Sequence, residues 1–262
     1  MLSVFIFIIG ACIGSFLNVC ICRIPRRESI IFPRSQCKCG AQIPWWLNIP
    51  LVSWLLLKGK ARCCGCNIPV RYFVVELLTA ILFIIVFHLS DSLSNFIIGS
   101  GFCSLLLVIA FIDIDTMEIY DAMSIGGIFV GFIVSLFFPG WHNEQSNMAS
   151  FTKSLSGACL GSGLVFWIAI IGEMVFKKEA IGCGDIKLLG TIGAFIGWKG
   201  CLFAILGGCL ISTLISLPLL LVWKLAKAKN FTIPREIPFA PVLVVGSITY
   251  VLYGQNILNL LL

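Results

Sequence analysis

Two short acidic stretches adjoin long apolar runs of the chain: Phe111-Ile112-Asp113-Ile114-Asp115 and Ile181-Gly182-Cys183-Gly184-Asp185-Ile186-Lys187. A carboxylate at the edge of an apolar segment of membrane length is energetically costly, and proteins keep such groups mainly where they have a function. The apolar runs around these stretches decide the fold. The two stretches themselves provide the first hypothesis about function.

The composition of the chain is that of a membrane protein. Hydrophobic residues make up 59% of the 262 residues and charged residues only 11%, with a mean hydropathy of +1.05. A soluble domain is about half apolar and one quarter charged. The net charge of +6 is interpreted as a signal for orientation in a lipid bilayer, and no nucleic-acid partner is predicted.

Eight apolar runs, each near the ~20 residues that cross a bilayer, predict an all-α polytopic protein with about eight transmembrane helices. The runs cover residues 2–21, 72–89, 95–112, 119–138, 155–176, 181–198, 201–223 and 239–262. The first run has no basic residue ahead of it and no small-residue cleavage pattern after it, so it is interpreted as a retained helix.

The sequence divides into three parts. Residues 1–22 form the predicted first transmembrane helix, and residues 23–71 form a polar, proline-containing loop module with clustered cysteines. Residues 72–262 form the predicted seven-helix membrane domain.

The distribution of basic residues predicts the orientation of the chain. The loops 23–71, 177–187 and 224–235 carry sixteen of the eighteen Lys and Arg residues. By the positive-inside rule these loops are cytoplasmic and both termini lie outside. The third span then ends at the cytoplasmic face beside Asp113, and the sixth begins there beside Asp185, so the two carboxylates are expected in the same leaflet.

Two carboxylates held close together cannot both ionise readily. One keeps a proton and polarises a carbonyl group while the other deprotonates water, which is the arrangement of aspartic proteases. Asp113 and Asp185 are therefore predicted to be catalytic, and the alternative for Asp185 is a capping role at a helix N-terminus. Asp115 lies about 200° further around a helix from Asp113 and is expected to face elsewhere. Glu118 is expected in a solvated turn.

Residues near Asp185 are candidates for supporting roles: Gly182, Gly184 and Lys187. Glycines beside the carboxylate would let a neighbouring helix or an extended peptide approach the backbone.

Five cysteines cluster in the polar loop module: Cys37, Cys39, Cys63, Cys64 and Cys66. In a reducing compartment this clustering favours a tetrahedral zinc site over disulfides, with four of the five as ligands. Cys63 and Cys66 have the usual Cys-x-x-Cys spacing, whereas Cys37 and Cys39 are one residue closer. The alternative is a loop that binds no metal, because Cys-x-Cys is a less favourable chelate.

A series of motifs follows in order along nearly the whole chain. They are Gly14-Ser15-Phe16-Leu17-Asn18-Val19, Arg23-Ile24-Pro25, Asn48-Ile49-Pro50-Leu51-Val52-Ser53-Trp54, Gly59-Lys60, Arg71-Tyr72 with Glu76, Ile112-Asp113-Ile114-Asp115, Gly182-Cys183-Gly184-Asp185-Ile186-Lys187-Leu188 and Ile237-Pro238-Phe239-Ala240-Pro241. Together these motifs resemble those of the bacterial type IV prepilin peptidases, and the combination is far more specific than any single motif.

The resemblance implies a bifunctional enzyme of the bacterial inner membrane. Members of this family cleave the leader of type IV prepilins or type II secretion pseudopilins after a glycine on the cytoplasmic side. They then methylate the new N-terminal amine with S-adenosylmethionine. The family's two catalytic aspartates correspond to Asp113 and Asp185, and its methyltransferase residues would include Gly14, Asn18 and the loop module.

The chain departs from the family pattern at several positions. Tyr120 and Phe73 replace prolines, and Ala61 replaces the leading cysteine of the second Cys-x-x-Cys pair. By alignment with the family, Cys39 and Cys64 would be ligands. The ligand set therefore stays open between these two interpretations of the cysteine spacing.

Three other functions remain as alternatives to the bifunctional enzyme. A transporter would use paired aspartates as a proton or cation site, although transporters favour the membrane midplane. A membrane scaffold would use the cysteine-rich loop for partner contact. A peptidase that has lost methylation is the third alternative.

Overall fold

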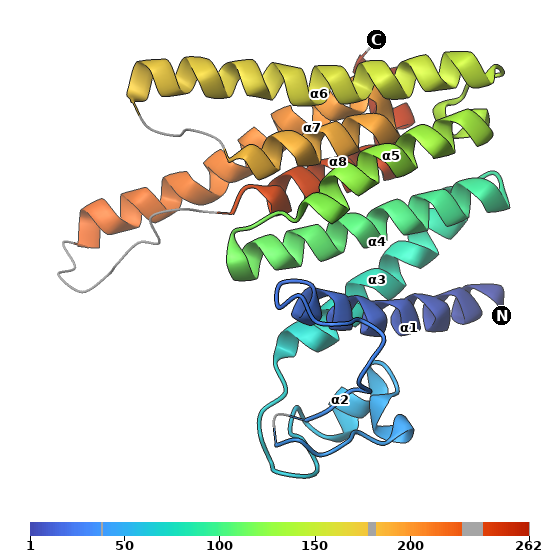
Figure 1. Ribbon diagram of the computed structural model, residues 1–262, viewed down its shortest axis with the longest axis vertical. Coiled ribbons are helices and arrows are strands. Elements are labelled where there is room, and N and C mark those ends of the chain that lie inside the picture. Colours follow the sequence, from blue (N-terminus) through green and yellow to red (C-terminus); the bar gives the residue numbers. More distant parts are fainter. Residues whose placement is uncertain (38, 178–181, 227–237, 262) are drawn as a thin grey trace. The chain divides into compact units, whose positions relative to one another are not determined.

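The computed structural model describes residues 1–37, 39–177, 182–226 and 238–261. Most of the predicted basic loop 224–235, together with Lys178 and Ile181, lies outside the described residues. The elements are α1 (Leu2–Arg23), η1 (Trp45–Asn48), α2 (Val52–Leu56), α3 (Val70–Leu89), α4 (Leu93–Thr116), α5 (Asp121–Phe137), η2 (Pro139–His142), α6 (Asn147–Phe176), α7 (Cys183–Ala226) and α8 (Ala240–Leu261) (Figure 1).

The helices confirm the predicted all-α membrane fold. Five described helical segments are long and apolar enough to cross a membrane, and they lie in α1, α3, α4, α6 and α7. Shorter apolar helices cover Asp121–Phe137 and Ala240–Gly254. The chain is therefore a multi-pass membrane protein. The predicted apolar runs coincide with these helices, and no spanning helix occurs in the described part of residues 24–69.

Helix α7 is a hairpin of two arms, which contain the predicted span 201–223 and, from Cys183 onward, the predicted span 181–198. Gly197 interrupts the helix with φ 71° and ψ 177°, a conformation that glycine adopts readily. Beyond this point the Cys201 thiol donates a hydrogen bond to the Leu189 carbonyl oxygen at 3.6 Å. Twelve residues would rise about 18 Å along a continuous helix. The second arm therefore folds back on the first, as two separate spans require.

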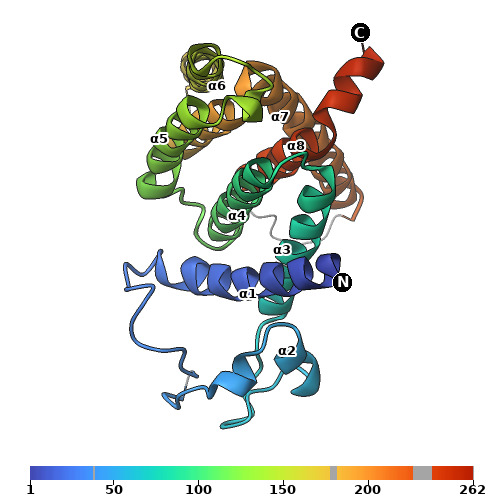
Figure 2. The same cartoon turned by 90° about the vertical axis from the view of Figure 1, so that its right-hand side faces the viewer.

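The chain divides into two compact units, Met1–Val108 and Ile109–Leu262, which we describe separately. In the first unit, α1 crosses and packs on α3 (Figure 2). The contact is close because α1 presents Gly10 and Gly14 to α3: an added Cβ would lie 2.8 Å from Cα of Ala80 and 2.7 Å from Cα of Glu76, respectively. Small residues spaced four apart are a usual basis for helix contact in membranes.

The loop module between α1 and α3 is attached to the first turns of α3. The backbone N–H of Leu51 donates to Oε2 of Glu76 at 2.7 Å. The rings of Trp54 and Phe73 lie 5.1 Å apart between centroids. These contacts hold η1 and α2 near the start of α3, so the module depends on the helix pair for its position.

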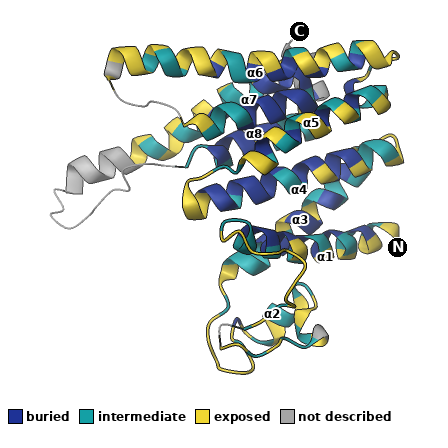
Figure 3. Ribbon diagram, in the orientation of Figure 1, coloured by how far each residue is buried: buried dark blue, intermediate teal, exposed yellow. Residues whose placement is uncertain are grey.

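In the second unit, α5, α6, α7 and α8 pack together with the last turns of α4. Backbone approach between α6 and α7 is tight, because a Cβ on Gly157 would collide with the Gly193 carbonyl. Ser154 adds a buried hydrogen bond to the Ala194 carbonyl at 2.6 Å. The outer face of α6 exposes large apolar residues such as Phe166 and Ile171 (Figure 3). Such a face is suited to contact with lipid.

Candidate active site

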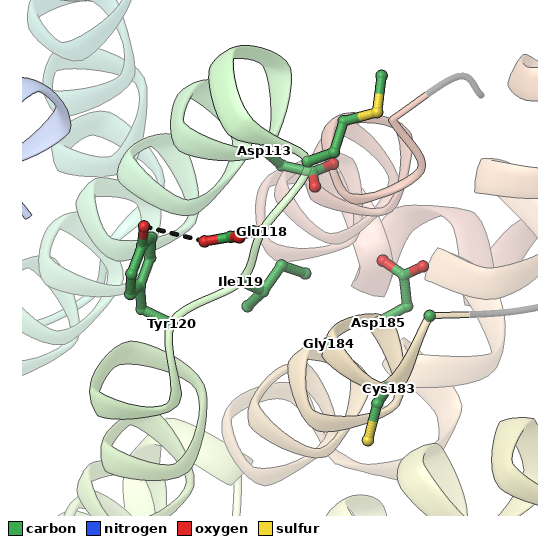
Figure 4. Close-up of a pocket in the computed structure, with 9 residues that line it drawn as sticks. Asp113, Glu118, Ile119, Tyr120, Cys183, Gly184 and Asp185 are labelled. Atoms are coloured by element: carbon green, nitrogen blue, oxygen red, sulfur yellow. Dashed lines mark hydrogen bonds between the residues drawn. The ribbon is translucent and has the colours of Figure 1, made fainter. Parts of the chain in front are cut away.

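The two predicted catalytic aspartates lie at one pocket. Asp113 belongs to the last turn of α4 and Asp185 to the first turn of α7. Figure 4 shows both carboxylates directed toward the space between these helix ends. The pocket has a volume of about 320 Å³ and is lined by Asp113, Met117, Glu118, Ile119, Tyr120, Gly182, Cys183, Gly184 and Asp185.

Asp113 is held in place by two elements. The helix that carries it continues to Thr116, four residues further than predicted, and the left-handed conformation of Met117, with φ 55°, ends it there. Oδ2 of Asp113 accepts a hydrogen bond from the backbone N–H of Ala240, at the start of α8, at 3.2 Å. Its side chain is buried, with 6% exposure. Asp115 is exposed and does not line the pocket, as predicted.

Asp185 lies at the N-terminus of α7, where the helix dipole favours a negative charge. The helix begins at Cys183, so Gly182 precedes it instead of belonging to it as predicted. Both aspartates line the same pocket, and their catalytic role stays a prediction.

The two glycines next to Asp185 differ in their surroundings. A Cβ on Gly184 would lie 3.0 Å from Cβ of Ile119, so this glycine lets the connection between α4 and α5 approach α7. Of the described residues outside its immediate neighbours, a Cβ on Gly182 would meet nothing nearer than Oδ2 of Asp185 at 3.7 Å. Gly184 is therefore explained by packing within the chain, whereas the described residues give no packing reason for Gly182.

Lys187 is directed away from the pocket. Its ammonium group forms an ion pair with Oδ1 of Asp121 at 2.5 Å, which joins the first turn of α7 to the first turn of α5. Lys187 does not line the pocket. The ion pair joins the N-terminal parts of α7 and α5.

Glu118 lines the pocket, which the sequence interpretation missed. It is exposed, as expected for a solvated turn, and it is one of the residues that line the pocket, with its carboxylate directed toward the Tyr120 hydroxyl (Figure 4). Oε2 of Glu118 accepts a hydrogen bond from the Tyr120 hydroxyl at 3.1 Å. The sequence did contain a signal for the place of Glu118. The connection between Asp113 and the next span is short, so its residues have to stay close to the helix end that carries Asp113.

Four of the five loop cysteines converge. The sulfur atoms of Cys37, Cys39, Cys63 and Cys64 all lie within 4.8 Å of one another, and Cys66 is not among them. The Cys37–Cys64 and Cys39–Cys63 sulfur pairs are 3.5 and 3.4 Å apart. Tetrahedral zinc with Zn–S bonds of ~2.3 Å requires sulfur atoms about 3.8 Å apart. The donor set therefore fits a single tetrahedral metal ion.

Local hydrogen bonds make one of these thiols more acidic than an ordinary cysteine. The backbone N–H of Cys39 and the thiols of Cys63 and Cys64 lower the pKa of Cys37 to about 7. The interaction with Cys37 is the main cause that raises the pKa of Cys63 to about 12. The protonation of each thiol therefore depends on that of its neighbours, because the sulfur atoms lie close together.

Comparison with known proteins decides the family. A model of the bacterial peptidase A24 N-terminal domain matches residues 8–89, and a model of the type IV leader peptidase family matches residues 100–217. Curated relatives named prepilin leader peptidase/N-methyltransferase match as well. One from Klebsiella pneumoniae is 34% identical over 202 residues, which cover 74% of this chain and 85% of the relative. The chain belongs to the type IV leader peptidase family.

Other relatives with this name cover the chain to different extents. The one from Xanthomonas campestris is 30% identical over 282 residues, with 96% of this chain and 91% of the relative covered. The one from Myxococcus xanthus is 38% identical over 220 residues, with 82% of this chain covered, and the match spans 63% of the relative's length. No solved structure matches the chain.

The two matched regions of this leader peptidase family member contain the two groups of candidate residues. The N-terminal match covers the cysteine cluster and the α1–α3 contact. The type IV leader peptidase match covers Asp113 and Asp185. The resemblance inferred from the motifs is thereby confirmed at the level of the family.

Proposed function

We propose that this chain is a prepilin leader peptidase and N-methyltransferase whose peptidase dyad is Asp113 and Asp185. The observation that carries the proposal is the convergence of both carboxylates on one pocket from the ends of α4 and α7. The relatives share the name prepilin leader peptidase/N-methyltransferase, and membership of the family does not favour the transporter alternative.

The dyad would work with one proton shared between two carboxylates. The ionised member takes a proton from a water molecule, which attacks the carbonyl carbon of the scissile peptide bond. The protonated member hydrogen-bonds the carbonyl oxygen and donates its proton as the tetrahedral intermediate forms. When the C–N bond breaks, a proton passes from the dyad to the leaving amine. Because activity requires the half-protonated pair, we expect a bell-shaped pH profile.

The substrate would be a prepilin or pseudopilin in the cytoplasmic membrane, cut where its leader meets its apolar helix. No described residue crowds the pocket at Gly182, which supports entry of an extended segment next to Asp185. A peptide bond has to leave the helical conformation before it is accessible to attack.

Methyl transfer would use S-adenosylmethionine, which supplies the methyl group when bound. Of the residues implied by the resemblance, Gly14 is required for the close contact with Glu76. Asn18 donates from Nδ2 to the Tyr72 carbonyl at 3.0 Å, and its Oδ1 is a buried acceptor without a hydrogen-bond partner among the described residues. Asn18 is therefore the better candidate for a polar contact with the cofactor.

A structural zinc ion would be held by Cys37, Cys39, Cys63 and Cys64. When bound it would cross-link two turns of a module too small to form a hydrophobic core of its own. The contacts of the module with α3 would then keep it next to the α1–α3 pair.

The decisive experiment is cleavage of a purified prepilin in detergent. Asp113→Asn and Asp185→Asn should each abolish cleavage while the proteins stay folded and membrane-inserted. Asp113→Glu should also lose at least about 100-fold, because a displacement of ~1 Å at a catalytic group has that cost. Asp115→Asn, on the same helix end but outside the pocket, is the matched control and should stay active. Cleavage by either Asn variant at near the unmodified rate would remove the dyad from the mechanism.

A further inference from the structure

Glu118 is a third carboxylate in the pocket, and the dyad chemistry leaves it without a role. It belongs to the connection of four residues, 117–120, between α4 and α5. Among the residues that the structure describes, the pocket lining contains three acidic residues and no Lys, Arg or His. None of the ion pairs in the described part of the chain involves Glu118. The nearest described cation of α7, on Lys187, is paired with Asp121 instead.

The Tyr120 hydroxyl holds Glu118 in a defined orientation. It donates to Oε2 at 3.1 Å, so Oε1 stays available to a second donor. A carboxylate that is already positioned loses less side-chain entropy when it binds a partner. Because Glu118 is exposed at the pocket, a charged group can reach it without passing through the protein.

The substrate class of the proposed function supplies the complementary charge. A prepilin leader lies on the cytoplasmic side and precedes an apolar membrane helix. Segments in that position carry an excess of Lys and Arg. The charged groups among the described lining residues are all acidic, and such a pocket attracts a cationic segment and disfavours an anionic one.

We propose that Glu118 is a specificity-determining residue that binds a Lys or Arg side chain of the leader close to the scissile bond. This inference rests on the proposed peptidase function and extends it, because it assigns a side-chain subsite next to the dyad. Tyr120 is the positioning residue for this subsite.

The test is a double-mutant cycle between enzyme and substrate. Cleavage of a prepilin by the unmodified protein and by Glu118→Gln is measured with the natural leader and with leaders in which each Lys or Arg in turn is replaced by Gln. With the natural leader, Glu118→Gln should raise KM about fivefold, the effect of one solvent-accessible charge pair. With one particular leader variant, that fivefold effect should disappear.

Charge reversal provides a second, independent readout. Glu118→Lys should cleave the natural leader poorly. Its activity should recover when the coupled basic residue of the leader is replaced by Glu. Glu173→Gln, which removes the same charge from an exposed position of α6 outside the pocket, is the matched control and should behave like the unmodified protein.

The outcomes separate this inference from the function on which it rests. If Glu118→Gln reduces cleavage by the same factor for every leader, the residue acts through the dyad or the loop and the subsite is refuted. An unchanged KM for Glu118→Gln also refutes it. A failure of the unmodified protein to cleave any prepilin contradicts the peptidase function itself, and the subsite with it.

Discussion

The backbone N–H of Ala240 donates a hydrogen bond to Oδ2 of Asp113 across 127 residues of sequence. The donor is the first residue of α8, and N–H groups in the first turn of a helix have no partner within the helix. Asp113 satisfies one of them, so the end of α4 and the start of α8 determine the position of the same carboxylate. Loss of this N–H donor should therefore slow cleavage even when both aspartates are present.

Ala240→Pro tests this relationship, because proline lacks the N–H and is tolerated in the first turn of a helix. We expect cleavage to fall about tenfold, which corresponds to loss of one hydrogen bond to a charged group. Ala240→Gly keeps the donor and is the control. Ala240 is buried, so the larger proline side chain could also disturb packing. Thermal unfolding of both variants measures any such loss of stability. An equal loss in both variants would show that packing, and not the hydrogen bond, is what matters.

Gly184→Ala and Gly182→Ala form a matched pair. The first places a methyl group 3.0 Å from Cβ of Ile119 and should lower both the melting temperature and cleavage, because Ile119 and the neighbouring pocket wall must move. The second has room within the chain and should leave the melting temperature unchanged, while it raises KM if the substrate passes beside Gly182. Equal melting temperatures for both variants would contradict the packing role of Gly184.

The ion pair between Lys187 and Asp121 should have a structural role only. Both side chains are partly exposed, at 33% and 62%, so the pair contributes at most about 1 kcal/mol. Lys187→Met and Asp121→Asn should each cause a small loss of stability, and the double variant should be no worse than either. Cleavage should stay within about fivefold of the unmodified protein. A loss as complete as that of Asp185→Asn would place Lys187 in the chemistry.

The metal prediction concerns which cysteines are ligands. We expect about one zinc ion per chain by elemental analysis, lost on substitution of Cys37, Cys39, Cys63 or Cys64 by Ser and retained in Cys66→Ser. Zinc binds thiolates, and the pKa of Cys37 is lowered to about 7. Because protons compete with zinc for all four thiols, affinity should weaken steadily as the pH falls. Zinc retained in Cys64→Ser but lost in Cys66→Ser would favour the Cys-x-x-Cys alternative.

The predicted topology places the connection between α5 and α6 on the non-cytoplasmic side of the membrane. In a variant whose native thiols are blocked or replaced, Gln145→Cys at an exposed position should react with a membrane-impermeant maleimide in intact spheroplasts. A second variant, Ser29→Cys in the basic loop module, should react only after lysis. The reverse pattern would overturn the orientation and with it the cytoplasmic site of cleavage.

Much of the fold followed from the sequence because membrane helices are defined locally. A run of about 20 apolar residues has few alternatives to a spanning helix, since backbone polar groups have no other partner in lipid. The same reasoning predicted the two arms of α7 as separate spans. The turn at Gly197 depends on a backbone conformation that glycine allows but that the sequence does not by itself predict. The cost of an acid beside an apolar helix identified Asp113 and Asp185 before any contact was known.

Tertiary structure decided what depends on distant parts of the chain. The donor from Ala240 to Asp113, the packing of Ile119 on Gly184 and the place of Glu118 in the pocket wall all result from how helix ends meet. The convergence of Cys64, and not Cys66, with the other thiols likewise depends on the local course of the loop, where Gly65 has a positive φ of 68°. Sequence alone determined that this is a multi-pass protein with two unusual aspartates, because burial of charge and of backbone is costly everywhere in a membrane. Packing determined which other side chains share their pocket.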